Sequence, residues 1–289
     1  LDAIDPMIDR LIASGVSGLY VCGSTGEGMS LSCDERKQVV EASLQASEKR
    51  VPVIVQVGHN SLADAADLAA HASRVGADVI SATCPSYFKT EDLDSLVASM
   101  QQIANAADEL PFYYYHIPAL TGSQIDVVEF LRQGGERIRN LVGMKYTTTL
   151  LHEYQSCLEV EGGRYDVVWG CDEMLLGAWA TGAEAAIGST YNIAAPLYRR
   201  IIDAVETGDL ETARHLQLKS VSMIQIMKAY PFHAALKAIM AMLGMPGGGC
   251  RLPLSDLTAD QQASLRDRLE SIDFFECCGH PRSVDGSVG

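Results

Sequence analysis

A single lysine interrupts an apolar run in the segment "NLVGMKYTTT", residues 140–149. Lysine is among the residues least often buried, because its charged form loses favourable hydration when it leaves water. In an apolar pocket the neutral amine is a nucleophile that can attack a carbonyl and form a Schiff base. The alternative for Lys145 is a side chain that reaches from the end of a strand to solvent.

A tyrosine-rich segment, "FYYYHIPALTG" (112–122), ends another apolar stretch. Because side chains alternate along a strand, Tyr113 and Tyr115 are expected to point one way and Tyr114 the other. Tyr115 lies where a strand ends, and its phenol can shuttle a proton or hold one in place. Aromatic packing in the core is the alternative for any one of these tyrosines, and His116 is expected to be structural.

The segment "CGSTGEGMSLSCDERKQ" (22–38) is rich in glycine and hydroxyl side chains. Its glycines allow the backbone to approach a ligand closely. Main-chain N–H groups around Ser24 and Thr25, together with the two hydroxyls, can hold an anion. The segment has no Walker lysine and no GxGxxG pattern, which argues against a nucleotide loop. A tight turn between a strand and a helix is the alternative.

Two further polar segments, "GCDEMLL" (170–176) and "IGSTYN" (187–192), also follow apolar stretches. Asp172, Glu173 and Ser189 can accept and donate hydrogen bonds to a polyhydroxylated ligand. The alternative for the two carboxylates is a position at a helix N-terminus, which the helix dipole favours. A metal centre would need histidine or more carboxylates near Lys145, so we expect no metal there.

The composition excludes some classes of function. The chain has 289 residues, 47% of them hydrophobic and 20% charged, which is typical of a soluble globular protein. Its formal net charge of −15 and the lack of a basic run argue against nucleic acid as a partner. An anionic small substrate remains compatible, because a local site can be positive on an acidic protein.

The eight cysteines are scattered and form no CxxC pair, which predicts free thiols in a reducing cytoplasm. Cys277, Cys278 and His280 do not have the spacing of a tetrahedral metal site. Apolar runs are shorter than the roughly 18 residues of a membrane span, and the chain shows no signal peptide. We therefore expect neither a membrane partner nor a zinc knuckle.

Apolar segments alternate with helical patterns, as in a parallel sheet whose two faces are covered by helices. The strands are predicted at 17–23, 51–58, 77–84, 110–117, 141–146, 165–170 and 183–189. Helices are predicted between them, for example at 34–48, 61–75, 91–107 and 172–181, the first preceded by the capping-box spacing of Ser32 and Glu35. These units predict a (β/α)₈ TIM barrel, with a doubly wound sheet as the alternative.

The predicted barrel lacks its first strand, because residues 2–15 already have a helical pattern. Either a strand precedes Leu1 or the sheet does not close as expected. We divide the chain into a barrel at 1–194, a C-terminal helical extension at 195–275 that breaks around Pro231, and a disordered tail at 276–289.

The ordered motifs "GSTGEG", "YYYHIPALTG", "GMKYTTT", "GCDE" and "IGSTYN" resemble a known family between about residue 2 and about residue 275. They are similar to the N-acetylneuraminate lyase branch of the pyruvate-dependent class I aldolases, a family that also contains dihydrodipicolinate synthase. The resemblance implies a homotetramer of TIM barrels with extra C-terminal helices. It also implies reversible cleavage of N-acetylneuraminate to N-acetylmannosamine and pyruvate, without a cofactor other than a Schiff base on Lys145.

The resemblance assigns a role to each motif. Lys145 would form the Schiff base, Tyr115 would relay a proton, and Ser24 and Thr25 would bind the pyruvate carboxylate. Tyr87 would reach the active site of a neighbouring subunit. The residues implied to face the sugar part of the substrate are Thr147, Gly170, Asp172, Glu173 and Ser189.

One position favours the lyase branch. Dihydrodipicolinate synthases generally carry an arginine in the segment that reads "IPALTG" here, and this chain has Leu120 at that place. Two alternatives stay open: an aldolase for another 2-keto-3-deoxy sugar acid, or an inactive truncated paralogue that only binds ligand.

Overall fold

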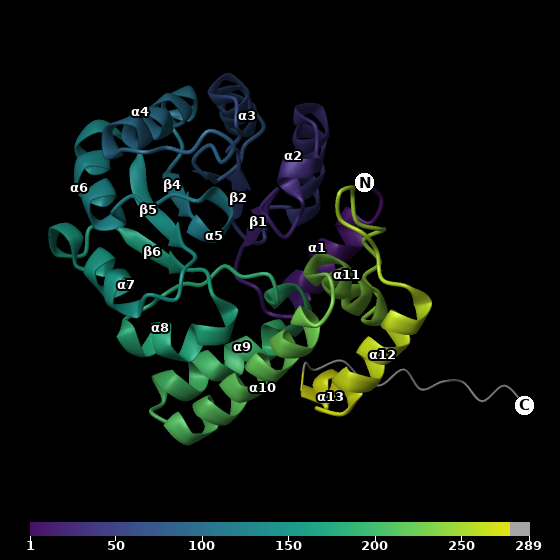
Figure 1. Cartoon of the computed structure of the whole chain (residues 1–289). Coiled ribbons are helices and arrows are strands. Elements are labelled where there is room, and N and C mark those ends of the chain that lie inside the picture. Colours follow the sequence, from purple (N-terminus) through teal and green to yellow (C-terminus); the bar gives the residue numbers. More distant parts are fainter. Residues whose placement is uncertain (278–289) are drawn as a thin grey trace, which may run out of the picture. The chain divides into compact units, whose positions relative to one another are not determined.

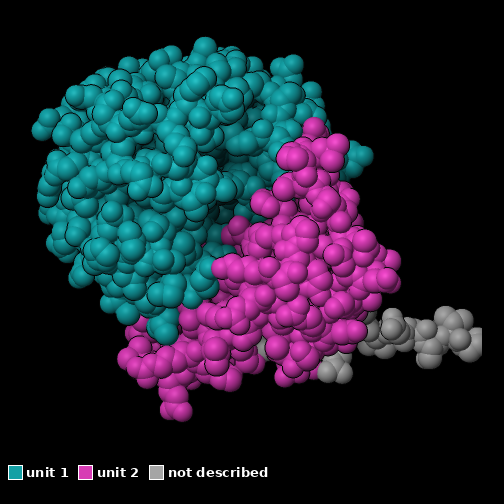
Figure 2. All heavy atoms as spheres, in the orientation of Figure 1, with its two compact units in different colours: residues 1–188 teal, residues 189–289 magenta. Residues whose placement is uncertain are grey.

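The computed structural model of the chain describes residues 1–277 (Figure 1). The chain divides into two compact units, Leu1–Gly188 and Ser189–Gly289, which Figure 2 colours separately. Each strand of the sheet belongs to the first unit.

Within residues 1–277 the sheet has six strands, and every neighbouring pair is parallel. Their spatial order follows the chain, whereas a doubly wound sheet reverses its strand order at a switch point. This order and the curled sheet of Figure 1 confirm the barrel-type winding. The strands are β1 (Leu19–Val21), β2 (Val53–Gln56), β3 (Val79–Ala82), β4 (Phe112–His116), β5 (Leu141–Tyr146) and β6 (Asp166–Trp169).

The seventh predicted strand segment continues this order, because Ala186 forms a parallel bridge with Trp169 of β6. Six of the predicted segments each contain a strand, and the seventh contains this single bridge. At the other edge, β1 pairs only with β2 in the described part of the chain.

Side chains on β5 point alternately to the outer and inner faces of the sheet. Tyr146 packs against Trp169 of β6 and Tyr154, with ring centroids 6.0 and 5.5 Å away. Tyr154 lies on helix α7 (Leu151–Leu158), so this aromatic cluster joins the outer face of the sheet to a helix. Because successive strand residues point to opposite faces, Lys145 points to the inner face.

With the exception of the short α5, the helices of the first unit from α1 to α8 contact one another in chain order, and they surround the strands (Figure 1). Ser32 caps α2 with the predicted capping box: its hydroxyl accepts a hydrogen bond from the Glu35 N–H, and the Glu35 carboxylate accepts one from the Ser32 N–H. The α-helices are α1 (Ile4–Ala13), α2 (Cys33–Ser47), α3 (Leu62–Arg74), α4 (Leu93–Ala104), α5 (Pro118–Thr121), α6 (Val127–Arg137), α7 and α8 (Leu175–Thr181). Short 3₁₀ turns are η1 (Gly28–Ser30), η2 (Asn105–Ala107), η3 (Val160–Gly162) and η4 (Asp172–Met174).

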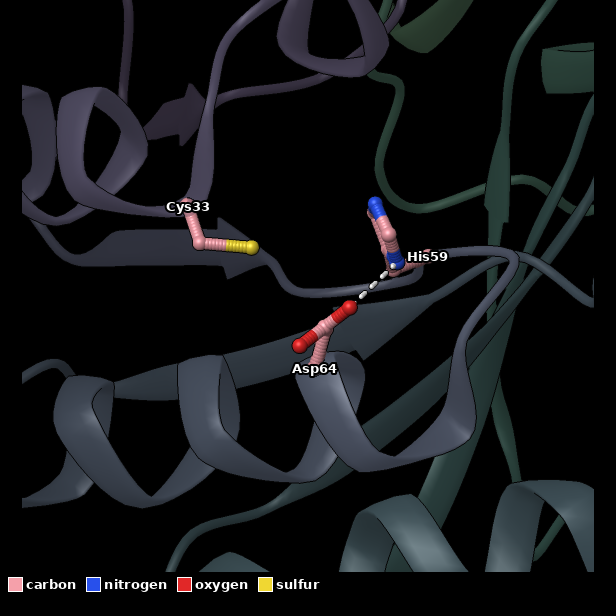
Figure 3. Close-up of side chains that lie close together, drawn as sticks. All are labelled: Cys33, His59 and Asp64. Carbon is pink, nitrogen blue, oxygen red and sulfur yellow. Dashed lines mark ion pairs between the residues drawn. The ribbon is translucent and has the colours of Figure 1, made fainter.

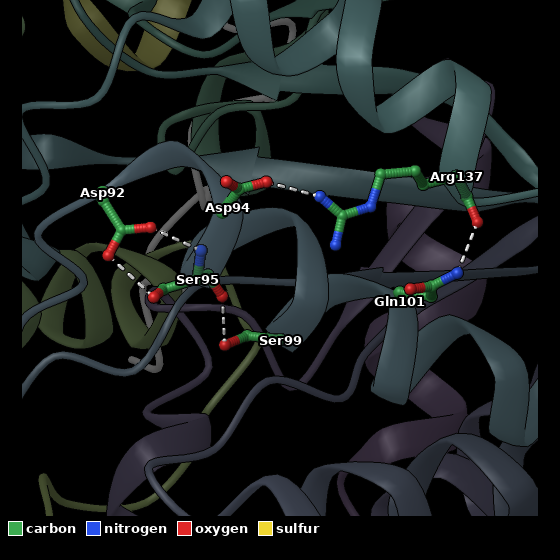
Figure 4. A network of polar contacts seen from close by, with 6 residues as sticks. All are labelled: Asp92, Asp94, Ser95, Ser99, Gln101 and Arg137. Carbon is green, nitrogen blue, oxygen red and sulfur yellow. Dashed lines mark hydrogen bonds and ion pairs between the residues drawn. The ribbon is translucent and has the colours of Figure 1, made fainter.

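Polar contacts join α4 to α6 on the outside of this ring (Figure 4). The Asp92 carboxylate accepts hydrogen bonds from the Ser95 N–H and hydroxyl at the start of α4. Arg137 at the end of α6 pairs with Asp94 at 2.7 Å, and the Gln101 amide donates to the Arg137 carbonyl at 2.6 Å. The bonds of the Ser95 N–H and the Arg137 carbonyl satisfy helix-end groups that would otherwise have no partner within their helix.

The second unit is helical in its described part. The predicted break around Pro231 is confirmed, since one helix ends at Lys228 and the next begins at Phe232. The expected boundary after residue 194 lies inside a helix. Of the tail predicted at 276–289, residues 276 and 277 form the end of another helix, and the rest lies outside the described residues. The helices are α9 (Tyr191–Glu206), α10 (Leu210–Lys228), α11 (Phe232–Met242), α12 (Ala259–Glu270) and α13 (Phe274–Cys277).

Candidate active site

Lys145 lies between two aromatic rings on the inner face of the sheet. Its side chain is 7% exposed, and Nζ lies 4.1 Å from the ring centroid of Tyr115 and 4.4 Å from that of Tyr20. The structure gives Lys145 no ion-pair partner among residues 1–277. The alternative of a side chain that reaches solvent is therefore wrong.

Tyr115 is held beside Lys145 by strand pairing. Tyr115 of β4 and Lys145 of β5 are paired residues of neighbouring parallel strands, so their side chains share a face. Tyr115 is 3% exposed, while Tyr114 points the other way and packs against Phe130 of α6. The phenol of Tyr115 lies 3.5 Å from the Ser24 hydroxyl, so the loop after β1 reaches the same place.

The loop that carries Ser24 and Thr25 is held tightly by its own backbone. The Gly28 N–H bonds the Gly23 carbonyl at 3.2 Å, and the Glu27 N–H bonds the Ser24 carbonyl at 3.1 Å. A Cβ at Gly28 would lie 1.9 Å from the Cys22 carbonyl oxygen, so this position requires glycine. The interpretation as a tight turn is therefore confirmed, and the turn places the Ser24 hydroxyl near Tyr115.

Arg36 of α2 anchors the helix that follows the Ser24 loop. Its guanidinium is buried and donates hydrogen bonds to the Gly58 carbonyl at 3.0 Å and to the Gln56 side-chain oxygen at 2.7 Å. The Gln56 amide in turn bonds the Thr83 hydroxyl at 3.3 Å. Burial lowers the pKa of Arg36 from its usual value. This chain of bonds connects the helix after the Ser24 loop to the ends of β2 and β3.

Thr147 follows β5 directly and presents a polar atom without a partner. Its hydroxyl oxygen is buried and has no hydrogen-bond partner among the described residues. Gly170, after β6, makes room for it, because a Cβ there would lie 2.1 Å from that oxygen. A buried hydroxyl without a partner is unfavourable, so a bound ligand that supplies a hydrogen bond would relieve it.

Asp172 and Glu173 follow Gly170 in the turn η4. Asp172 is buried against the last residue of the first unit, since a Cβ at Gly188 would overlap its carboxylate. Glu173 is half-buried. Ser189 begins the second unit, where its carbonyl accepts a hydrogen bond from the Asn192 side chain at 2.8 Å.

Three other predicted positions lie apart from Lys145 or serve the core. Tyr87, 79% exposed, packs edge-to-face on Phe88 in the loop after β3. Leu120 of α5 is 62% exposed. His116 is buried and stacks on Tyr146, and burial lowers its pKa to about 4, as expected for a structural histidine.

Tyr20 of β1 is a site residue that the sequence interpretation missed. Its ring meets Tyr115 edge-to-face at 5.7 Å, its hydroxyl donates to Ser81 at 2.9 Å, and burial raises its pKa well above the usual value. The only signal in the sequence was its alternation with Leu19 in the strand "SGLYVCG". Within residues 1–277 the side chains close enough to share a metal ion are Cys33, His59 and Asp64, none of which contacts Lys145.

A buried amine, a neighbouring phenol and a loop of hydroxyls form a group suited to Schiff-base chemistry on a carbonyl compound that carries an anion. The amine supplies the nucleophile, and the phenol lies where a proton has to move. The hydroxyl of Thr147 and the carboxylates after β6 add hydrogen-bonding capacity on the neighbouring strand ends.

Comparisons with known proteins agree with this geometry. A model of the dihydrodipicolinate synthetase family matches residues 1–272. The N-acetylneuraminate lyase of Xenopus tropicalis is 41% identical over 284 residues, which are 95% of this chain and 92% of that protein. The structure of Proteus mirabilis N-acetylneuraminate lyase matches with a TM-score of 0.92 and 39% identity over 94% of this chain and 92% of that one.

The name of a more distant structure refers to a catalytic lysine in that protein. It is a catalytic lysine mutant of the Ruminococcus gnavus sialic acid aldolase, with a TM-score of 0.89 and 27% identity over 96% of this chain and 91% of that one. The family model and the long matches at high identity lead to one conclusion. The chain belongs to the dihydrodipicolinate synthetase family.

Proposed function

We propose that the protein is a carbon–carbon lyase of the class I aldolase type, which reversibly cleaves N-acetylneuraminate to N-acetylmannosamine and pyruvate. The observation that carries the proposal is the buried amine of Lys145 between Tyr115 and Tyr20, with the Ser24 hydroxyl 3.5 Å from the Tyr115 phenol. Relatives named N-acetylneuraminate lyase, at 41% and 39% identity, support this substrate over other sugar acids.

Lys145 acts first in the proposed mechanism. Its neutral amine adds to the C2 ketone of the open-chain sugar, and loss of water leaves an iminium on Nζ. Removal of the C4 hydroxyl proton forms the aldehyde of N-acetylmannosamine as the C3–C4 bond breaks. The electrons of that bond move to the iminium and form an enamine, so the lysine itself supplies the electron sink. Protonation of C3 and hydrolysis release pyruvate and the free amine.

Tyr115 relays the proton that leaves the C4 hydroxyl, because its phenol lies beside both the amine and the Ser24 loop. Ser24 and Thr25 bind the carboxylate of the pyruvate part through hydroxyl and main-chain donors. The sugar part is bound by the group Thr147, Gly170, Asp172, Glu173 and Ser189. Thr147 is the member whose role in binding has specific structural support, since its buried hydroxyl lacks a hydrogen-bond partner in the described residues.

The proposal extends to the assembly and its compartment. A homotetramer would cover Tyr87 and Phe88, which together expose an aromatic pair, and would place Tyr87 at the site of a neighbouring subunit. The six cysteines whose side chains are described are free thiols, as a reducing cytoplasm would maintain them. None of the described helices is long and apolar enough to cross a membrane.

Borohydride reduction tests the central step. With pyruvate present, reduction should trap a covalent adduct on Lys145, which peptide mass spectrometry would locate. The Lys145→Met variant, which keeps an apolar side chain of similar length, should melt cooperatively yet form no adduct. A folded wild-type protein without an adduct at residue 145 would contradict the mechanism.

The substrate is tested separately from the mechanism. N-acetylneuraminate should give the highest kcat/KM among a panel of 2-keto-3-deoxy sugar acids in a coupled pyruvate assay. A higher value for another acid would retain the Schiff base and reject the substrate. A cooperative melt with ligand binding but no turnover on the panel would favour a binding paralogue.

A further inference from the structure

A second group of reactive side chains lies outside the proposed mechanism. Cys33 is the first residue of α2, His59 lies in the loop after β2, and Asp64 is in the first turn of α3. One ligand atom from each residue lies within 4.8 Å of the other two, and all three side chains are half-buried. Figure 3 shows the sulfur, the imidazole and the carboxylate directed toward one another.

The imidazole of His59 presents a lone pair to this cluster. The Ser61 N–H donates a hydrogen bond to His59 Nδ1 at 3.0 Å, so Nδ1 is the acceptor nitrogen of the neutral ring. The Asp64 carboxylate oxygen lies 3.5 Å from the same nitrogen. Two electron-rich atoms therefore face each other, and their repulsion is relieved when a proton or a metal cation lies between them.

The spacing fits a small tetrahedral ion. Bond lengths of about 2.0–2.3 Å to zinc imply donor atoms roughly 3.3–3.8 Å apart in a tetrahedron. The 3.5 Å from Nδ1 to the Asp64 oxygen falls in that range. The Cys33 sulfur lies within 4.8 Å of one ligand atom of each of the other two residues.

Cys33 supplies a sulfur ligand to this group. The residue opens a helix of 15 residues, whose N-terminus stabilises negative charge. Thiolate and imidazole ligands select zinc-like ions over magnesium and calcium, which prefer sites made of oxygen atoms.

We propose that Cys33, His59 and Asp64 bind one divalent ion of the zinc class, with a fourth position open to solvent. Binding replaces the Ser61 N–H bond to Nδ1 with a bond to the metal. Because Cys33 begins the helix that follows the Ser24 loop, the ion would tie that loop to the start of α3 and stabilise the first unit. The sequence did not reveal the group, since its members are separated by 26 and 5 positions (59 − 33 and 64 − 59) in no standard zinc pattern.

Cobalt(II) provides a direct probe of this site. The reduced chain of residues 1–289, stripped with a chelator, should bind one equivalent of cobalt and show a thiolate-to-cobalt charge-transfer band together with the visible bands of tetrahedral cobalt. Cys33→Ser should abolish the charge-transfer band. His59→Gln and Asp64→Asn should each weaken cobalt binding by about tenfold or more.

Two controls separate the site from other thiols and from the acidic surface. Cys250→Ser changes a half-buried thiol of the second unit, and the double variant Cys277→Ser/Cys278→Ser removes two cysteines that are adjacent in the sequence. Both should keep the wild-type band. Zinc should raise the melting temperature of the wild type and of both controls, but not that of Cys33→Ser.

The outcomes are decisive in either direction. A wild type without the charge-transfer band, a band that persists in Cys33→Ser, or a band lost from the double variant would each overturn the proposal. Cysteine at the first turn of a helix is readily replaced by serine, and a melt of each metal-free variant checks its fold. These readouts do not depend on lyase activity, so the result stands apart from the proposed function.

Discussion

The two rings that enclose Lys145 act on every charged form of its nitrogen. In the proposed mechanism an iminium on Nζ carries a positive charge until the C3–C4 bond breaks, and the faces of Tyr115 and Tyr20 attract that charge. Such contacts contribute about 0.5–2 kcal/mol each, depending on desolvation. The rings thus favour the covalent intermediate over a neutral adduct, while the phenol of Tyr115 remains available for proton transfer.

Removing only the phenolic oxygen of Tyr115 separates these two roles. Tyr115→Phe keeps the ring against Lys145, so we expect an intact melt and a kcat reduced by about 10²–10⁴, the usual size of a lost proton-transfer group. Tyr113→Phe is the matched control on the same strand, since its hydroxyl bonds Asp166 at 2.6 Å. Steady-state kinetics of both variants checks the assignment, and equal kcat values in the two would contradict it.

His116 provides a pH signature of the core. Its pKa is about 4 in the folded protein and about 6.5 when unfolded, so the unfolded chain binds more protons between these values. Stability should therefore fall as the pH drops from 6.5 toward 4, by about 3 kcal/mol at most from this residue. His116→Gln, which does not titrate, should lose less stability over the same range. Denaturant melts at several pH values measure the difference, and parallel curves would exclude the effect.

Strand pairing and a tight turn bring the reacting groups together from three elements. β4 and β5 place Tyr115 beside Lys145 through their register, and the loop after β1 adds Ser24. The loop holds its shape because Gly28 lies against the Cys22 carbonyl. Arg36 then fixes the following helix to the end of β2, so the loop is anchored at both ends.

Two glycines of this loop form a matched pair for a test. Gly28→Ala would place a methyl group 1.9 Å from the Cys22 oxygen, so the loop must move. We expect a loss of about 1–3 kcal/mol of stability and a raised KM for the keto acid. Gly26→Ala has 3.7 Å to its nearest neighbour and should change neither. Chemical denaturation and kinetics measure both variants. A normal KM in Gly28→Ala would show that the shape of the loop does not matter for keto acid binding.

The whole chain exposes an aromatic pair that a monomer would leave in water. Tyr87 and Phe88 are 79% and 83% exposed, and the Asn60 side chain holds the Tyr87 backbone in place at 3.1 Å. A loop that is held in place by a hydrogen bond and exposes two large aromatic rings is typical of a protein–protein contact surface. The proposed homotetramer gives this surface its partner.

Mixing two inactive variants tests whether Tyr87 serves another subunit. Lys145→Met lacks the amine and Tyr87→Ala lacks the aromatic, so each alone should have low activity. Mixed oligomers, formed by denaturation and joint refolding, should regain part of the wild-type rate because some sites then hold Lys145 from one chain and Tyr87 from another. Sedimentation checks that oligomers form. Activity no greater than the sum of the separate variants would show that Tyr87 does not act in this way.

Local pattern was enough to predict the order of strands and helices, because burial on both faces and capping residues act over a few neighbouring positions. It also predicted the face of Tyr115 and Lys145, since alternation along a strand is a local rule. The division after residue 194 did not follow from such rules, because a compact unit depends on contacts across the whole chain.

The amino-acid sequence by itself determined the parallel βα arrangement, the capped start of α2 and the candidate groups at the strand ends. Tertiary structure alone decided that Tyr20 encloses Lys145, that Arg36 supports the Ser24 loop, and that the Thr147 hydroxyl over Gly170 has no partner among residues 1–277. It also decided that Cys33, His59 and Asp64 meet. The reason is physical: periodicity tells which way a side chain points, but only strand register and helix packing determine what lies there to meet it.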